Sequence, residues 1–132
     1  MYHCFFHTNL SLAEFDPLIV EFGIYGSGVD KVTRYTYNYG FQVHCTTSRD
    51  PSITTYDWYF GNGTKVGLRN ANFREGYYPD NKTLVLQIGL NRRLSFCDGG
   101  NYTCVVKTNS SRTENRSFHL LIDGKLHILL YI

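Results

Sequence analysis

Four cysteines have the clearest chemistry in this chain, because thiols can form disulfides, bind metals or act as nucleophiles. They are Cys4, Cys45, Cys97 and Cys104. An even number of cysteines suits an oxidising, extracellular environment, and four cysteines can form disulfides in three different pairings. His3, Cys4 and His7 could contribute to a metal site, but no second cluster of ligands accompanies them. We therefore interpret residues 1–16 as an N-terminal arm and predict no metal and no cofactor.

Asn-x-Ser/Thr sequences offer a second chemistry, since they are the acceptors for N-linked glycans. Ten Asn residues and twenty Ser and Thr residues among 132 would give about 1.5 such sequences by chance, whereas the chain has six. The excess predicts a secreted or cell-surface glycoprotein, although no signal peptide is present in residues 1–15 of this sequence. The candidate glycosylation sites are Asn9, Asn62, Asn81, Asn101, Asn109 and Asn115.

Composition excludes several classes of function. The net charge of +2 without a run of Lys and Arg argues against nucleic-acid binding, and no glycine-rich phosphate-binding motif is present. No apolar run is long enough to span a membrane. The length suits one domain, and the 16% of aromatic residues favours strands over helices.

Period-two alternation predicts seven to nine short strands and no helix of useful length. The longest alternating stretch, residues 33–45, contains Gly40, where we expect a bend that separates an edge segment from the main strand. Residues 46–55 and 69–81 are expected to form a loop and an irregular segment, and Leu94 to close the connection at 89–97. The other expected strands are residues 18–22, 56–60, 64–68, 82–88, 100–107 and 118–122.

Four residues at the start of the strand 100–107 have a telling spacing: Asp98, Gly100, Tyr102 and Cys104. A Tyr two residues before a Cys shares its face of the strand, so the ring can fold over the preceding corner while the sulfur points into the core. The Gly permits a tight entry to the strand, and the Asp can hydrogen-bond to the backbone or pair with a basic side chain at the turn.

Together with Cys45 and with Trp58 thirteen residues after it, this pattern resembles the immunoglobulin superfamily over residues 17–123. The resemblance implies an all-β sandwich of two antiparallel sheets, closer to the compact I or C2 types than to a variable domain. It also implies a disulfide between Cys45 and Cys104, which would stabilise the domain by about 4 kcal/mol. The implied core residues are Trp58, Leu84, Leu86, Asp98 and Tyr102, and residues 124–132 would form a last strand or the start of a linker.

Cys4 and Cys97 remain after this pairing. A second bridge from the arm to the corner at Cys97 is the simplest account, and an intermolecular disulfide or a free thiol is the alternative. We predict no catalysis: His44 is next to Cys45, but that cysteine is the implied disulfide partner, and Asp57 and Asp98 lie on different elements.

A weaker resemblance links the chain to the interleukin-18-binding proteins, which are small secreted decoys of host and poxviral origin. It rests on residues 48–51, on Trp58 followed by the turn 61–64, and on segments 82–86 and 101–105. That family presents aromatic anchors where this chain has Asp57 and Lys65, and a cysteine where it has Asn81. The cytokine ligand is therefore not carried over.

The function predicted is an extracellular protein-binding module, either a secreted decoy or immunomodulator for a cytokine or surface receptor, or one ectodomain module of an adhesion or immune receptor. A domain in a reducing compartment with accidental glycosylation motifs is a third alternative, and the oligomeric state is left open. Glycans at Asn62 and Asn101 would shield the half of the predicted binding sheet near them and leave its other half, or the opposite sheet, free for contact. We expect the contact at the free half of the predicted sheet, with loops 46–55 and 108–112. Its outward residues would be Asp57, Tyr59, Val105, Lys107, His119 and Leu121, unless Tyr59 and Val105 merely cover a neighbouring strand.

Overall fold

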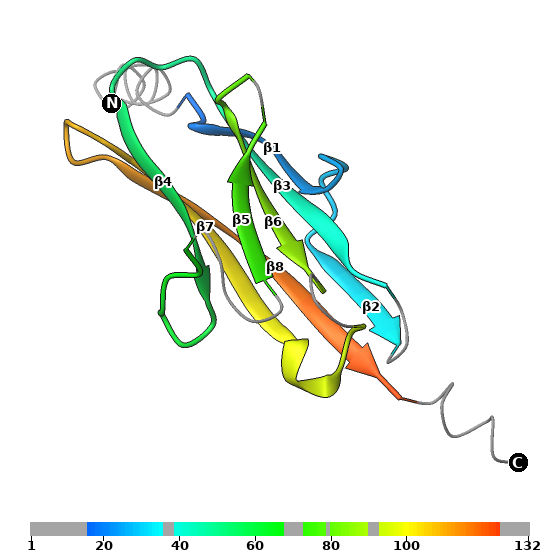
Figure 1. Cartoon of the computed structure of the whole chain (residues 1–132). Coiled ribbons are helices and arrows are strands. Elements are labelled where there is room, and N and C mark those ends of the chain that lie inside the picture. The colour runs from blue at the N-terminus through cyan, green and yellow to red at the C-terminus, as the bar shows by residue number, and fades with distance from the viewer. Residues whose placement is uncertain (1–15, 36–38, 68–72, 79, 90–92, 125–132) are drawn as a thin grey trace, which may run out of the picture.

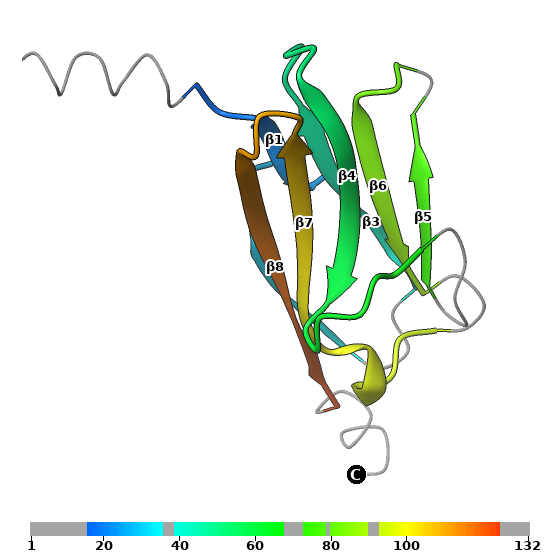
Figure 2. The ribbon, with the colours of Figure 1, turned by 90° about the vertical axis from the view of Figure 1, so that its left-hand side faces the viewer.

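Two four-stranded sheets pack face to face in the computed structural model, which describes residues 16–35, 39–67, 73–78, 80–89 and 93–124 (Figure 1). One sheet has the order β1-β3-β6-β5 and the other the order β2-β8-β7-β4. Figure 2 shows β8, β7 and β4 side by side in one layer, with β6 and β5 in the other. The strands are β1 (Ile19–Ile24), β2 (Lys31–Tyr35), β3 (Phe41–Thr47), β4 (Ile53–Phe60), β5 (Phe73–Tyr77), β6 (Thr83–Ile88), β7 (Gly100–Thr108) and β8 (Thr113–Asp123).

The predicted all-β sandwich is confirmed. The described residues contain eight strands, and their one helical element is the short 3-10 turn η1 (Phe96–Asp98). The order β1-β3-β6-β5 corresponds to the ABED sheet of an immunoglobulin-type sandwich, and β8-β7-β4 corresponds to its GFC sheet.

The alternating stretch 33–45 divides at Gly40 as predicted, but its two parts join different sheets. β2 pairs in parallel with β8 in one sheet, whereas β3 pairs antiparallel with β1 and β6 in the other. The chain can pass close to β6 here because position 40 has no side chain: a Cβ there would lie 2.2 Å from the carbonyl oxygen of Ile88. Alternation alone does not reveal such a change of sheet, since both parts keep period two.

Two other strand predictions were wrong. Residues 69–81 were expected to be irregular, yet β5 forms within them and pairs with β6 along its whole length. A strand over 64–68 was expected, but between 64 and 67 the pairing is a single bridge from Lys65 to Tyr59. The loop expected at 46–55 is shorter, because β3 continues to Thr47 and β4 begins at Ile53.

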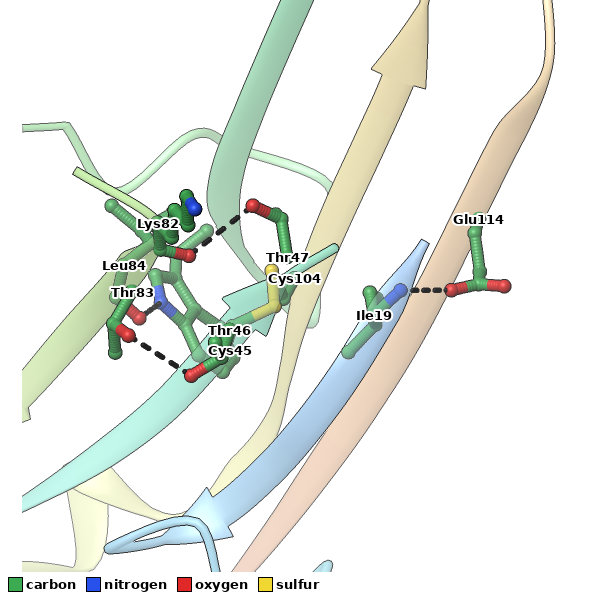
Figure 3. The surroundings of a disulfide bond; sticks show 10 residues. Ile19, Cys45, Thr46, Thr47, Lys82, Thr83, Leu84, Cys104 and Glu114 are labelled. Atoms are coloured by element: carbon green, nitrogen blue, oxygen red, sulfur yellow. Dashed lines mark hydrogen bonds between the residues drawn. A yellow bond between two sulfur atoms is a disulfide. The ribbon is translucent and has the colours of Figure 1, made fainter. Parts of the chain in front are cut away.

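The core is built around Trp58 and the disulfide. A bond between Cys45 on β3 and Cys104 on β7 joins the two sheets, as the resemblance implied (Figure 3). Trp58 is fully buried, its ring centroid lies 5.6 Å from that of Phe22, and its Nε1 donates to the carbonyl oxygen of Leu84 at 3.3 Å. The ring and the sulfur bridge therefore connect both sheets, and Leu84, Leu86 and Leu94 are buried in the same cluster.

The corner before β7 holds a second buried polar arrangement. Tyr102 is 2% exposed, and its hydroxyl donates to the backbone carbonyl of Asp98. Asp98 is also buried, and its carboxylate accepts from the backbone N–H of Ser95 at 2.8 Å. Asp98 was expected to bond either to the backbone or to a basic side chain, and its carboxylate bonds to the backbone. The hydrogen bonds from Ser95 and Tyr102 together hold the corner.

Burial, and to a smaller extent the charge of Asp98, raises the pKa of Tyr102 well above that of an exposed tyrosine. The folded state therefore favours the neutral phenol. Its stabilising contribution is fully present below about pH 10, the pKa of an exposed tyrosine, and is lost as the pH rises through the higher folded-state value.

Tyr102→Phe is expected to lower the free energy of unfolding by about 1–2 kcal/mol, because it removes the buried hydrogen bond and leaves the Asp98 carbonyl without that donor. The variant should also lose less stability than wild type above about pH 10, since it lacks the phenol. Denaturant unfolding at neutral and alkaline pH measures both effects. Tyr59→Phe, which changes a half-exposed hydroxyl, is the control, and equal stability of Tyr102→Phe and wild type would contradict this role.

Candidate protein-binding face

The outer face of the β2-β8-β7-β4 sheet carries the residues predicted to bind a partner. Register places Val105 of β7 directly between Asp57 of β4 and Asn115 of β8. One row away, Thr103 lies between Tyr59 and Ser117. Residues opposite each other in antiparallel strands have Cβ atoms about 4.5–5.5 Å apart, so these two rows form one continuous patch, the Val105 patch: Asp57, Tyr59, Thr103, Val105, Asn115 and Ser117.

Apolar surface in the Val105 patch is real but limited. Tyr59 and Val105 are half-buried, while Lys107 at the end of β7 is exposed. Each of the two residues therefore buries part of its side chain against the sheet and leaves part of it accessible. His119 is half-buried and Leu121 is 54% exposed, but they lie farther along β8, beside β2.

An ion pair frames the patch on the β4 side. The Lys65 ammonium lies 3.1 Å from the Asp57 carboxylate, and Lys65 is the residue bridged to Tyr59. Since both groups are partly solvated, the pair contributes at most about 1 kcal/mol to stability.

Sequence reasoning missed Lys65 as a site residue. The signal was the Gly61-Asn62-Gly63 turn, whose hairpin register sets Lys65 against Tyr59.

Two predicted glycosylation motifs run through the same face. Asn101 and Asn115 are exposed, and the hydroxyls of their motif residues Thr103 and Ser117 lie 2.9 Å apart across the strands. The Asn101 amide oxygen lies 2.7 Å from Nδ1 of His119. Asn115 thus lies in the half of the sheet that the sequence prediction left free of glycans.

The remaining motifs lie in turns or outside the described chain. Asn62 is in the β4 turn, where its side chain accepts from the Thr64 backbone N–H at 2.9 Å. Asn109 follows β7, and its N–H donates to the Ser52 carbonyl at 2.9 Å, which brings the predicted contact loops 46–55 and 108–112 together. Asn81 precedes β6 with a φ of 57°, and Asn9 lies outside the described residues.

The opposite sheet has an aromatic cluster that sequence reasoning missed. Its central residue, His44 on β3, makes edge contacts with Tyr25 and Tyr78, and the Tyr78 hydroxyl lies 3.0 Å from Nε2 of His44. Burial lowers the pKa of His44, and the charge of Glu21 opposes this effect.

A hollow on the same sheet lies beside Gly76 and Tyr78 and measures about 170 Å³. This volume is less than the roughly 300–1,000 Å³ of small-molecule sites, so the hollow offers a surface for contact rather than a ligand pocket.

Among the described residues, no group of three His, Cys, Asp or Glu side chains could hold a metal ion. The same part of the chain has no helix long and apolar enough to cross a membrane. His3, Cys4 and His7 lie outside it, and so does any bridge between Cys4 and Cys97. Cys97 is itself exposed, and its thiol is free in the structure.

No protein-family model and no curated protein matches the chain. Solved structures do. The Ig1-2 module of the Drosophila receptor protein tyrosine phosphatase DLAR matches with a TM-score of 0.59 and 19% identity over 80% of this chain, which spans 47% of that module. Dpr1 IG1, solved bound to DIP-eta IG1, has a TM-score of 0.58 and 17% identity, covering 80% of this chain and 98% of that one.

The Ig1 domain of mouse SynCAM 2 is a further match, with a TM-score of 0.55 and 16% identity over 71% of this chain and 91% of that one. These matches establish an immunoglobulin-like fold. They give no support to the resemblance to interleukin-18-binding proteins.

Proposed function

We propose that this chain is an extracellular recognition module that binds an immunoglobulin-like domain of another protein through the Val105 patch. The observation that carries the proposal is that half-exposed Tyr59 and Val105 are diagonal neighbours in successive rows of the sheet, with the Asp57–Lys65 ion pair at their edge. An aromatic and an aliphatic side chain framed by charges have the composition of a small interface core with a polar rim.

Two further observations support the proposal. Three similar structures were solved as complexes between immunoglobulin-like domains: Dpr1 IG1 with DIP-eta IG1, Dpr11 IG1 with DIP-gamma, and the ZIG-8–RIG-5 IG1–IG1 heterodimer. The disulfide through the core suits an oxidising, extracellular compartment.

The proposal is tested with refolded, glycan-free protein against a panel of immunoglobulin-like ectodomains by surface plasmon resonance. At least one domain of the panel is expected to bind. The double variant Tyr59→Ala with Val105→Ala should weaken that binding by at least about 30-fold, the effect of losing one hot-spot residue.

The chain offers a matched control on the opposite sheet. Tyr25 and Val20 are 71% and 49% exposed, so Tyr25→Ala with Val20→Ala removes the same two side-chain types from the other face. This variant should bind almost as tightly as wild type. The proposal fails if no domain binds, or if a folded Tyr59/Val105 variant binds as tightly as wild type.

A further inference from the structure

Asn115 has a position that no other described glycosylation motif shares. It is exposed, it lies within β8 on the outer face of the sheet, and register places it directly opposite Val105. Asn101 lies two rows away opposite His119, Asn62 is in the β4 turn, and Asn81 and Asn109 are in turns at strand ends. A group attached to Asn115 therefore stands beside the central apolar residue of the Val105 patch.

The chemistry of this position is fixed by the motif Asn115-Arg116-Ser117. An oligosaccharide donor activated by a diphosphate leaving group transfers its sugar to the asparagine amide. The Asn115 side-chain nitrogen forms a bond to C1 of the first sugar, the bond from C1 to the diphosphate oxygen breaks, and the nitrogen loses one proton to solvent. The product carries a bulky, hydrophilic group on the Asn115 side chain, whose Cβ lies about 5 Å from the Cβ of Val105.

We infer that a glycan on Asn115 closes the Val105 patch, so that occupancy of this one site decides whether the face can bind a protein. The inference rests on the proposed function for its consequence. The covering of Val105 by the glycan does not rest on the proposed function, because it follows from the position of Asn115 whatever the partner is. A hydrated sugar cannot replace the dry contact that a hot-spot residue needs, so the glycosylated and partner-bound states exclude one another.

A partner-independent experiment tests the covering of Val105. The chain is secreted from mammalian cells with Val105→Cys as its accessible thiol, in a background of Cys4→Ser and Cys97→Ser. Mass spectrometry first measures occupancy of Asn115. The rate of labelling by a polyethylene glycol maleimide is then compared with the same protein carrying Asn115→Gln. Labelling is expected to be severalfold slower in the glycosylated protein, and N-ethylmaleimide, a small reagent, should discriminate less.

Matched variants separate the site from the presence of glycans in general. Asn81→Gly removes the motif in the turn that precedes β6 of the other sheet, and glycine accepts the positive φ of 57° at that position, so this variant should label as slowly as its parent. Ser117→Ala removes the Asn115 motif without touching the asparagine, and it should label as fast as Asn115→Gln. An unoccupied Asn115, or equal labelling with and without its glycan, overturns the inference.

The partner arm distinguishes this failure from that of the proposed function. A domain that binds the refolded protein should bind the secreted Asn115→Gln variant at least about 30-fold more tightly than the glycosylated chain. Equal binding of both forms overturns the glycan inference and leaves the proposed function intact. If the Val105→Cys thiol labels slowly in the glycosylated protein but no domain binds the Asn115→Gln variant, the proposed function is overturned and the covering of Val105 is established.

Discussion

Trp58→Ala is expected to lower the free energy of unfolding by about 3–5 kcal/mol, the range for removing a large buried aromatic side chain. Trp58 is fully buried on β4, it packs against Phe22 of the other sheet, and it donates a hydrogen bond to the Leu84 carbonyl. Alanine would leave a cavity between the sheets and remove the only side-chain donor that this ring brings to β6. Urea or guanidinium unfolding followed by circular dichroism measures the change.

Tyr59→Ala is the control for this prediction, because Tyr59 is the next residue on the same strand and points the opposite way. Its side chain is half-buried on the outer face, so its loss should cost less than about 1 kcal/mol. If Trp58→Ala lowered the free energy of unfolding no more than Tyr59→Ala does, the packing of the indole between the sheets would not contribute to stability as proposed.

The second large effect concerns the disulfide. Replacing both Cys45 and Cys104 by alanine should lower the free energy of unfolding by about 4 kcal/mol, because the bond closes a loop with a sequence separation of 59 residues in the unfolded chain. Both residues are fully buried, so the two sheets also lose a covalent link in the centre of the core.

A reducing agent gives an internal check on this prediction. Dithiothreitol should bring the wild-type protein close to the stability of the double variant, and it should leave the double variant unchanged. If reduction destabilised the double variant as much as wild type, the stabilising bond would lie elsewhere, in Cys97 or Cys4.

The fold could be predicted from the sequence because its strongest constraints lie in fixed spacings. Cys45, Trp58, Tyr102 and Cys104 each face the core, and period two places them there without knowledge of the partner strands. β5 could not be predicted in this way. Phe73 packs its ring against Phe60, but Gly76 weakens strand propensity and the segment lies at a sheet edge, so its pairing with β6 is decided by tertiary contacts.

The candidate face was predictable in part. Alternation correctly identified Tyr59 and Val105 as outward residues, since it depends only on each strand. It did not reveal that Asn115 is opposite Val105, because that depends on the register of two strands. The register is set by the turn, where Thr108 donates to the Arg112 carbonyl and Ser111 has a φ of 69°. Ser-rich turns give a weaker signal of their geometry than Asn-Gly turns do.

The aromatic cluster of the opposite sheet was missed for a related reason. Tyr25 follows β1 and Tyr78 follows β5, and each meets His44 only after the three strands have assembled. Contacts between residues so far apart in sequence leave no local periodicity.

The central claim is that the Val105 patch, and not the opposite sheet, meets the partner. Methyl resonances of valine in the glycan-free domain, followed during titration with an immunoglobulin-like domain that binds, test it most directly. The account predicts that the Val105 methyls shift or broaden while those of Val20 and Val85, which lie on the other sheet, stay unchanged. Shifts at Val20 and Val85 with an unperturbed Val105 would contradict it.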